Sequence, residues 1–560
     1  MTNYLYRHWK TPLTLLLGIA VFFFWWKAYP HALSYQEQYQ LFLWTPQYFS
    51  ERVAVPGGLA DWLGELVVQF YYVEWLGAFL LSLFFMLLQR LVWASMKSHA
   101  LLLYPLSFIP CVLLLWSMGD ASVLLGYGMA LAGVLAFSCL TYLFGLHKGR
   151  KPLLWAVVAD VVLIPLVYWL FGGLVWLYVG IRMIHMGGRP WLWTVIWMGA
   201  TFWMASIALP QWPMQQIIMP IAYYRIPLLC PWMLSVIPLV VFLLCTVAAF
   251  WKGEKARPTT RIRKGVWTAL LVETAAVAGF ACWLVPTGFD KDTYALIRQD
   301  YLVRNQRWDD IIKEAADYQV RTPFSSVCVN LALSQKRLLA DRMFDFYQSG
   351  DDALVMHSIG DLTSNMPSME ALWHLGMVNA TQRYAFNLQG SILNAKRSGR
   401  LTRRIAQCML ANGHYQTARK QLQWLSQSLF YRQWANEQLT ALQQEGDARE
   451  RAILSDADIK RVRSLRFKSD FLFSIGEPAT MFGLLFNDNH QNLMALDYFL
   501  AQHLLSGNLP AFQQYLSWAQ QYGGYRQMPL GYQDVMRCIQ NNGNVSDSPY
   551  RNYVKRMTGQ

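Results

Sequence analysis

Long apolar runs in the first half of the chain constrain its fold more than any other feature. A helix needs about 20 apolar residues to cross the hydrocarbon core of a bilayer, and the sequence before Pro286 contains nine such runs. They lie near residues 11–29, 72–94, 101–118, 121–146, 152–170, 172–187, 191–209, 228–251 and 265–286. Bulky Trp25 and Trp26, followed by Lys27, stand after the first run where a signal peptide would carry small residues, so this run is predicted to remain as an anchor. The runs predict a polytopic α-helical membrane domain over residues 1–286.

The composition changes near Pro286. The whole chain of 560 residues is 54% hydrophobic and only 15% charged, far from a soluble average. After Pro286, charged and amide residues occur at the frequency of a water-soluble domain. Short helical segments separated by polar breaks follow, at 301–312, 408–419 and 504–512, and more loosely at 331–344. A small residue at the turn and an aromatic soon after it are typical of tetratricopeptide-type hairpins. We therefore expect an all-α chain whose residues 287–560 form a TPR-like α-solenoid of irregular period.

The net charge of +14 reflects orientation more than nucleic-acid binding. Basic residues gather at every second boundary between the runs, and the largest group comprises Lys252, Lys255, Arg257, Arg261, Arg263 and Lys264. This is the distribution of the positive-inside rule. Nine spans then place the N-terminus in the cytoplasm and the C-terminal domain in the periplasm, at a bacterial inner membrane. If residues 152–187 formed one tilted span in place of two, the C-terminal domain would be cytoplasmic.

The sequence contains no motif for a disulfide framework, a metal site or a nucleotide site. The eight cysteines imply no disulfide framework, and neither CxxC nor HExxH occurs. The sequence also lacks a P-loop and a GxGxxG followed by a helix. We predict no metal site and no bound nucleotide; a divalent metal stays compatible with the chemistry discussed below, but no motif supports one.

The first connection between runs, residues 30–70, is the richest candidate for a site. Leu59, Trp62, Leu63, Val67 and Phe70 recur at helical spacing, while Asp61, Glu65 and Gln69 form another face. The pattern predicts two short helices along the membrane surface, with the apolar side toward lipid and the acidic side toward a cavity. A solvated connector is the alternative interpretation.

Two further features bear on function. Arg225, in the connection between the seventh and eighth runs, is one of few cations on the outer side and suits a phosphate or pyrophosphate group; an interfacial anchor is its alternative role. Asp160 and Glu273 lie inside apolar runs, where an acid is costly and is a functional candidate by default. Structural roles are the preferred interpretation for both acids.

In this layout the chain resembles the C-type glycosyltransferase superfamily, whose multi-span members use lipid-phosphate-linked sugars. The resemblance implies two membrane-parallel helices and an acidic residue in the first outer loop, and an outer soluble domain as in bacterial oligosaccharyltransferases. Glu37, in Gln36-Glu37-Gln38, is the acidic residue nearest to the expected position, but no Asp-Xaa-Asp or Asp-Glu pair stands where the superfamily often has one. The whole chain also resembles an uncharacterised family of bacterial multi-span proteins with the same loop.

The resemblance implies a set of roles. Glu37 or Asp61 would remove the proton from the acceptor, and Arg225 or Arg52 would stabilise the departing phosphate of a polyprenyl-phosphate-linked sugar. The acceptor or sugar would lie against Tyr35, Tyr39, Trp44, Trp62 and Glu65.

The sequence therefore leaves two functions open. The first is a membrane glycosyltransferase or oligosaccharyltransferase that acts on a protein or glycan acceptor. The second is a non-catalytic scaffold whose helical repeats bind a protein or peptide on their concave face. In both, membrane lipids are partners and nucleic acid is not. Transport is disfavoured, because the runs contain few charges and no inverted repeat is visible.

Overall fold

The chain is helical throughout the part that the structure describes. This computed structural model describes residues 9–97, 100–144, 153–186, 191–219, 231–251, 264–356, 365–393, 396–468, 474, 476–522, 525, 527–541 and 545–558. No strand occurs among these residues, as the all-α prediction requires. The chain divides into two compact units, unit 1 (Met1–Asp290) and unit 2 (Lys291–Gln560). The predicted boundary after Pro286 lies four residues earlier than this division, because the last helix of unit 1 continues through Pro286 to Thr287.

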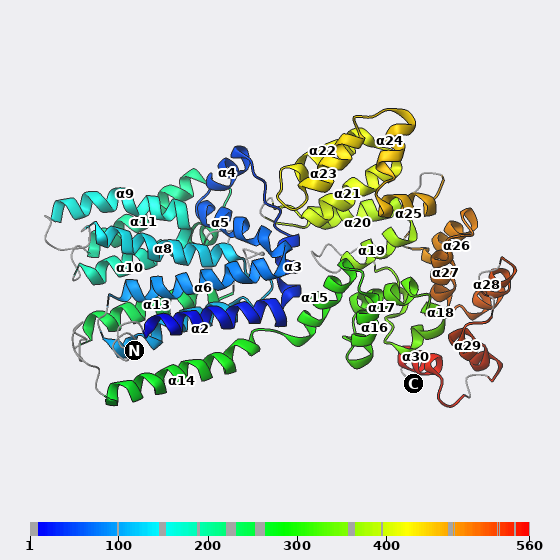
Figure 1. The fold of residues 1–560 in the computed structure, drawn as a ribbon, viewed down its shortest axis with the longest axis horizontal. Helices are drawn as coiled ribbons and strands as arrows, with labels where there is room; N and C mark the ends of the chain where they lie inside the picture. The colour runs from blue at the N-terminus through cyan, green and yellow to red at the C-terminus, as the bar shows by residue number, and fades with distance from the viewer. Residues whose placement is uncertain are drawn as a thin grey trace. The chain divides into compact units, whose positions relative to one another are not determined.

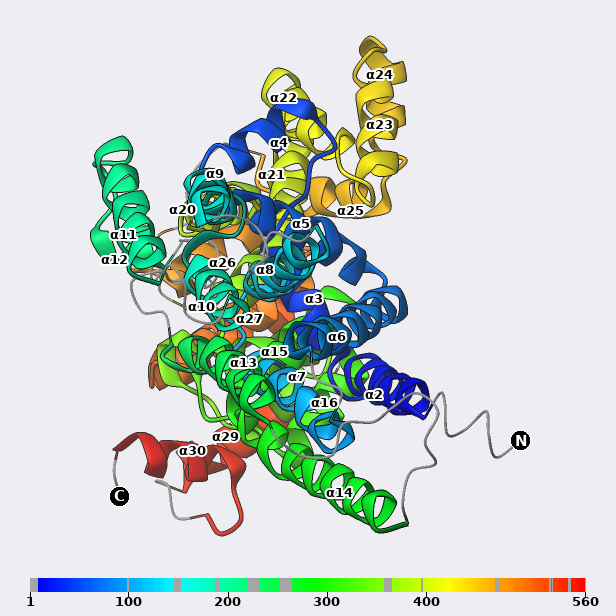
Figure 2. The same cartoon turned by 90° about the vertical axis from the view of Figure 1, so that its left-hand side faces the viewer.

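Unit 1 is a bundle of apolar helices (Figures 1 and 2). Its α-helices are α2 (Lys10–Phe23), α3 (Pro30–Gln38), α4 (Pro46–Val53), α5 (Gly58–Val68), α6 (Glu74–Met96), α7 (Ile109–Ser117), α8 (Leu125–Leu143), α9 (Leu153–Phe171), α10 (Val175–His185), α11 (Trp191–Ala208), α12 (Met214–Ile218), α13 (Met233–Phe250) and α14 (Lys264–Thr287). Short π or 3-10 turns extend or join them: η1 (Phe24–Ala28), η2 (Gln69–Tyr72), η3 (Leu101–Leu103), η4 (Pro105–Phe108) and η5 (Gly172–Leu174).

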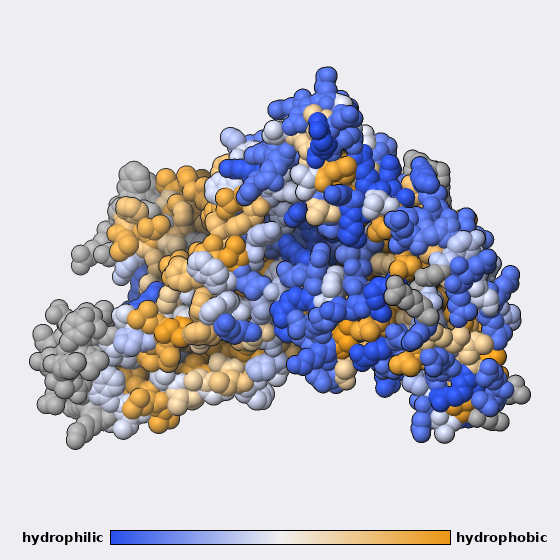
Figure 3. Space-filling model, turned by 45° about the vertical axis from the view of Figure 1, so that its right-hand side comes forward, coloured by the Kyte–Doolittle hydropathy of each residue, from blue (hydrophilic) through white to orange (hydrophobic). Residues whose placement is uncertain are grey.

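In the described part of unit 1, six helices are long and apolar enough to cross a membrane, by length and composition. They are Lys10–Ala28, Glu74–Met96, Leu125–Leu143, Val157–His185, Met233–Phe250 and Gly265–Thr287, and Leu101–Ser117 and Leu192–Ala208 are shorter apolar helices. Hydrophobic side chains cover much of the bundle surface (Figure 3). These helices indicate a membrane protein. The count of nine spans stays a prediction.

The stretch Val157–His185 folds back on itself and is not one straight helix. Gly172, between α9 and α10, has a φ of 72°, a conformation that glycine adopts without strain. Asp160 of α9 and Arg182 of α10 form a fully buried ion pair with Nε to Oδ1 at 2.5 Å. In one continuous helix these residues would lie about 33 Å apart. The two helices are therefore antiparallel, and the buried ion pair supports a structural role for Asp160.

Each end of the bundle contains a group of packed aromatic rings, after which we name it. At one, the Trp9 end, the Trp9 ring lies 5.1 Å from that of Tyr104 and 5.7 Å from that of Trp267. At the other, the Phe289 end, the Phe289 ring lies 4.4 Å from that of Tyr29. Helices α2 and α14 both run from the Trp9 end to the Phe289 end, because Trp9 and Trp267 lie together at the first end and Tyr29 and Phe289 at the second. The chain therefore enters the bundle at one end and leaves it at the other.

Unit 2 consists of successive helix pairs. Its α-helices are α15 (Lys291–Arg304), α16 (Trp308–Asp317), α17 (Pro323–Gln335), α18 (Leu339–Arg342), α19 (Met366–Leu375), α20 (Val378–Gly390), α21 (Gly399–Asn412), α22 (Tyr415–Ser426), α23 (Arg432–Ala441), α24 (Gly446–Ile453), α25 (Ala457–Leu465), α26 (Pro478–Asp488), α27 (Leu493–Leu505), α28 (Leu509–Gln521), α29 (Leu530–Gln540) and α30 (Pro549–Thr558). Two short 3-10 turns, η8 (Met343–Asp345) and η9 (Gly350–Ala353), lie between α18 and α19.

One turn geometry recurs five times in the described part of unit 2. After α21, Gly413 has a φ of 80°, and the N–H of His414 donates to the carbonyl of Met409 at 2.8 Å. This 6→1 bond satisfies a carbonyl that the helix end leaves open. Positive φ and the same 6→1 bond also occur at Gln306, Arg337, Gly376 and Gly507. The four predicted hairpins are confirmed as helix–turn–helix units, and the fifth, at Gly376, was not predicted.

Candidate functional site

The segment between α2 and α6 forms a layer of short helices at the Phe289 end. The sequence predicted two helices, but the structure has three, α3, α4 and α5. The additional helix is α4, which begins at Pro46, where a missing N–H costs nothing, and which Thr45 caps by accepting from the Tyr48 N–H at 3.2 Å. A left-handed Gly57, with φ of 79°, turns the chain from α4 into α5. On α5, Gly64 lies so close to Gly126 of α8 that a Cβ would meet its backbone nitrogen at 2.6 Å.

Helix α5 buries its acidic stripe, whereas the cavity that the sequence predicted beside this stripe stays a prediction. Asp61, Glu65 and Gln69 are buried, with exposures of 7%, 0% and 6%. Trp62 and Leu63, on the other stripe, are partly exposed. Burying carboxyl groups is costly unless partners compensate for the lost water. The layer must therefore supply polar partners from neighbouring helices.

Glu65 finds these partners on α4. The Arg52 Nε lies 3.1 Å from the Glu65 Oε2, and the Tyr48 hydroxyl donates a short hydrogen bond to the same carboxylate oxygen. Arg52 Nη2 also donates to the Tyr48 hydroxyl at 3.3 Å. Burial, and then the charge of Glu65, raise the pKa of Tyr48 well above its ordinary value, so Tyr48 acts as a donor. We call Tyr48, Arg52, Asp61 and Glu65 the α4–α5 cluster.

The charge balance of the α4–α5 cluster matters for its chemistry. Burial alone would lower the pKa of Arg52, but Glu65, Tyr48 and Asp61 outweigh burial and raise it above its ordinary value. The guanidinium is thus held as a cation by the carboxyl groups around it. With two carboxyl groups and one guanidinium, the cluster carries no surplus positive charge for a phosphate. This balance favours a structural role for Arg52 over its predicted role as a phosphate ligand.

Glu37 lies on α3, whereas the residues of the α4–α5 cluster lie on the next two helices. Its side chain is 4% exposed. Its neighbour Gln36 donates from Nε2 to the carbonyls of Ala121 at 2.7 Å and Val123 at 3.2 Å. These bonds hold α3 against the turn that begins at Asp120, whose Oδ1 accepts from the Ser122 N–H at 2.9 Å. Asp120 therefore lies in the connection between α7 and α8, in the turn that Gln36 of α3 contacts. The sequence alone does not indicate this contact.

The predicted sugar-facing aromatics occupy different environments. Tyr39 is buried at 1% exposure, and its ring lies 5.1 Å from that of Tyr35. Trp44 is 49% exposed, and its indole N–H donates to Gln69 Oε1 at 3.1 Å. The Trp62 ring is partly exposed. Trp44 and Trp62 therefore have exposed surface, whereas Tyr39 belongs to the packing of α3.

Some of the predicted site residues lie outside the described part of the chain or on different helices. Arg225 lies outside the described residues. The two candidate bases, Glu37 and Asp61, lie on separate helices, α3 and α5. Over the described ranges, no three His, Cys, Asp or Glu side chains are grouped so that they could hold a metal ion. Tyr48 and Gln36, which organise the layer, were missed because neither belongs to an amphipathic stripe.

Comparison with known proteins gives a family but no activity. A family model described as "Family of unknown function (DUF6057)" matches residues 6–558, almost the whole chain and both units. No curated protein and no solved structure matches. The comparisons give no support to the resemblance to C-type glycosyltransferases, and the helical structure does not conflict with it.

Proposed function

The chain belongs to the DUF6057 family of unknown function, and from its α3–α5 layer we propose that it is a membrane-bound glycosyltransferase. It would transfer a sugar or oligosaccharide from a polyprenyl-phosphate-linked donor to a protein or glycan acceptor. One observation carries this proposal: Glu37, Asp61 and Glu65 are buried at one end of an apolar bundle. An anchor alone does not require carboxyl groups there, since each costs free energy to bury.

The proposed chemistry begins with Glu37. As the acceptor oxygen or nitrogen attacks the anomeric carbon, its proton passes to the Glu37 carboxylate, and the bond from that carbon to the phosphate oxygen breaks. The polyprenyl phosphate leaves with the bonding electron pair. Asp61 is the second candidate base. Arg225 is the proposed cation for the phosphate, because Arg52 already pairs with Glu65 at 3.1 Å.

The α4–α5 cluster then has a positioning role. The contacts of Tyr48 and Arg52 with Glu65 hold α4 against α5. They thereby position Asp61 on the buried face of α5 and Trp62 on its partly exposed face. We propose that the exposed faces of Trp44 and Trp62 lie against the sugar or the lipid headgroup. Tyr35, Tyr39 and Glu65 would support these residues from within the layer.

The proposal includes the location and orientation of the protein in the cell. We propose nine spans in a bacterial inner membrane, with the Trp9 end cytoplasmic and the Phe289 end periplasmic. The positive-inside rule supports this orientation, because nine of the 18 Lys and Arg residues before Pro286 lie in the sequences that follow α8, α10 and α13. Unit 2, a TPR-like stack in this proposal, would then be periplasmic.

A matched pair of variants tests the proposal. Glu37→Gln keeps size and hydrogen-bonding capacity but removes the base, and loss of a general base costs about 10²–10⁴-fold in rate. Glu51→Gln is the control, because Glu51 lies on the exposed face of α4, where it accepts from Gln47 at 2.8 Å. Each variant is expressed in a deletion strain, and glycoproteins and glycolipids are profiled by mass spectrometry. We expect E51Q to restore the profile and E37Q to fail at equal membrane abundance.

Asp61→Asn and Arg225→Ala extend the test. D61N is expected to lower the rate if Asp61 acts as base, and R225A to raise the apparent KM for the lipid-linked donor. If E37Q, D61N and R225A all restore the profile, the site assignment is wrong.

A scaffold is the second candidate function, and the five repeated turns of unit 2 favour it. Stacked helix pairs present extended surfaces for partner proteins. In this case E37Q would behave like E51Q, and deletion of the gene would leave every glycan unchanged while cell-envelope protein complexes lose a component.

A further inference from the structure

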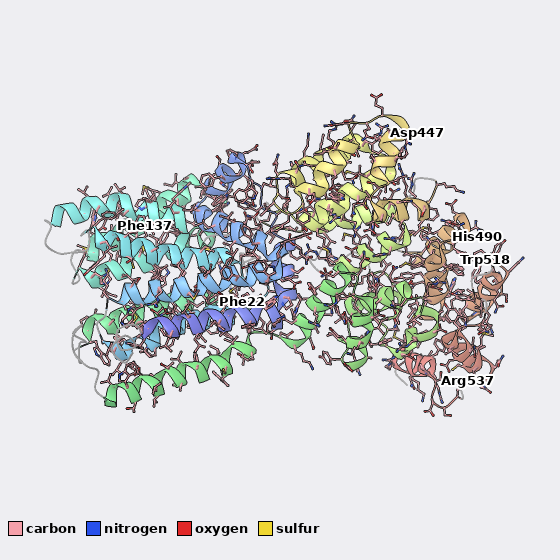
Figure 4. The ribbon with its side chains drawn as sticks, in the orientation of Figure 1. Phe22, Phe137, Asp447, His490, Trp518 and Arg537 are labelled. Carbon is pink, nitrogen blue, oxygen red and sulfur yellow. The ribbon has the colours of Figure 1, made fainter. Side chains whose placement is uncertain are left out.

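Two cations from different helices lie close together at the Trp9 end of unit 1. Lys10 begins α2, and Arg90 lies on α6, which packs along α2 (Figure 4, in which Phe22 is labelled on α2). The Arg90 Nη2 donates to the Thr11 Oγ1 at 3.3 Å. The Lys10 Nζ lies 4.3 Å from the centre of the Trp93 ring, one turn after Arg90. Each cation therefore contacts a close neighbour of the other, and their charges repel.

This pair of cations lacks a counter-charge. Among the described residues, neither Lys10 nor Arg90 forms an ion pair, and residues 1–8 contain no Asp or Glu. By contrast, the Arg52 guanidinium at the Phe289 end is paired with Glu65. Two like charges held together raise the free energy of the folded state unless an anion lies beside them. The Trp9 end therefore offers a place for an anion that this part of the chain does not supply.

Aromatic rings indicate the depth of this place in a membrane. Trp9, Trp93 and Tyr104 lie around the Lys10 ammonium, whose nitrogen is 5.9, 4.3 and 5.3 Å from the three ring centres. Tryptophan and tyrosine gather at membrane–water interfaces, where both an apolar ring and a polar group are accommodated. The Tyr104 hydroxyl donates to the Lys10 carbonyl at 2.8 Å and so holds the start of α2 among these rings. The two cations are therefore expected at the depth of phospholipid headgroups.

The surface next to the cations, toward the middle of the bundle, is apolar and exposed. On α6, the exposed Leu87 and Leu83 precede Arg90 by one and two turns. On α2, the exposed Leu15 follows Thr11 by one turn. Residues three, four or seven positions apart share one face of a helix. A ligand that joins a phosphate to hydrocarbon chains could therefore contact the cations and these leucines together.

We propose that Lys10 and Arg90 bind the phosphate of an anionic phospholipid, whose acyl chains lie along the exposed leucines of α2 and α6. Arg90 has further N–H groups besides the one that it donates to Thr11, and they can donate to phosphate oxygens. Lys10 supplies a compact positive charge. A zwitterionic headgroup is disfavoured, because its ammonium would bring a third cation to the pair. Basic sites between membrane helices bind lipid headgroups in other proteins. The inference does not depend on the glycosyltransferase proposal.

Native mass spectrometry of the full chain in a neutral detergent tests the proposal. The protein is titrated with phosphatidylglycerol, and the affinity for the first bound lipid is measured for the wild type, Lys10→Gln, Arg90→Gln and the double variant. We expect each single variant to weaken binding about fivefold and the double variant about thirtyfold. Lys27→Gln is the matched control and should leave this affinity unchanged. Lys27 is likewise a lysine over an indole, with its Nζ 3.6 Å from the Trp26 ring, but it lies at the Phe289 end.

Three further ligands separate the contributions of net charge, phosphate and acyl chains. Phosphatidylcholine, diacylglycerol and glycerophosphoglycerol, which is the headgroup without acyl chains, should each bind the wild type at least tenfold more weakly than phosphatidylglycerol. The proposal fails if K27Q weakens binding as much as R90Q, since the lipid would then be attracted by charge without a site. It also fails if glycerophosphoglycerol binds as tightly as the lipid, since the site would then be one for a soluble anion.

Thermal unfolding provides a second measurement. Arg90→Gln removes one of two repelling charges and one exposed hydrogen bond, so without lipid its Tm should equal or exceed that of the wild type. Added phosphatidylglycerol should raise the Tm of the wild type more than that of R90Q. A lower Tm of R90Q without lipid would show that the guanidinium stabilises the bundle by itself, and would overturn the proposal.

Discussion

Replacing Arg400 with methionine should destabilise unit 2 more than any surface change. Arg400, on α21, is 7% exposed and donates to Asp300 of α15 at 2.8 and 3.0 Å. It also donates to Glu370 of α19 at 3.0 and 3.2 Å. Methionine keeps the aliphatic length but leaves the two buried carboxyl groups without this cation. Breaking a buried pair from one side costs about 3–5 kcal/mol.

The pKa of Glu370 provides a second measure of this free-energy cost. Burial alone would raise it, but Arg404, Arg400 and His374 outweigh burial and lower it from 4.5 to about 2. That difference corresponds to roughly 3 kcal/mol, shared among the three partners. Because the folded-state pKa is the lower one, this stabilisation is present above pH 4.5 and lost as the pH falls toward 2. In the variant Glu370 keeps Arg404 but loses Arg400, so its pKa should rise, and the deficit of the variant should shrink as the pH falls below 4.5.

Hydrogen exchange measured by mass spectrometry localises the effect. In Arg400→Met at pH 7, amides of α15, α19 and α21 should exchange about 10²–10³-fold faster than in the wild type, while amides of α2 should not change. The control is Arg342→Met, whose pair with Asp345 at 3.1 Å is about 42% exposed and should matter little. A loss below tenfold in R400M, or a deficit that does not change with pH, would refute this reasoning.

Three further predictions concern the fold. Asp160→Asn leaves Arg182 buried without its counter-charge and should lower the Tm in detergent, whereas replacing both residues with leucine should be better tolerated; equal Tm values for the single and double variants would contradict this. Gly413→Ala should destabilise unit 2 by about 1 kcal/mol because of its left-handed φ, and Gln306→Gly should stabilise it by a few tenths to about 1 kcal/mol, both in thermal melts. A fusion after Gln560 should give active alkaline phosphatase and dark green fluorescent protein; the reverse result would place unit 2 in the cytoplasm.

The sequence predicted well what depends on local pattern. Apolar length located the membrane helices, and the inward stripe of Asp61, Glu65 and Gln69 followed from helical periodicity alone. Three of the four predicted turns of unit 2 have a glycine or an amide residue between the two helices, namely Gln306, Gly413 and Gly507. At Gln306 and Arg337 the turn forms without glycine, so its conformation is imposed by the packing of the flanking helices.

The partners of the candidate residues could not be predicted. Arg52 and Glu65 lie on different helices, and their pairing depends on the angle that Gly57 sets between α4 and α5. Asp160 and Arg182 meet only because the chain reverses at Gly172. Gln36 reaches carbonyls 85 and 87 residues away. Such contacts depend on three-dimensional packing, for which the linear pattern contains no signal.

The contact between Gly119 and Gly288 has a consequence for biosynthesis. A Cβ on either glycine would meet a backbone carbonyl oxygen at 2.3 Å, so the end of α14 seats directly on the turn after α7. The accompanying hydrogen bond from the Trp116 indole to Thr287 joins residues 171 positions apart. At about 5–20 residues per second, a ribosome needs roughly 10–30 s to supply the second partner. The Phe289 end of a nascent chain therefore stays open to the membrane surface until the last helix of unit 1 arrives.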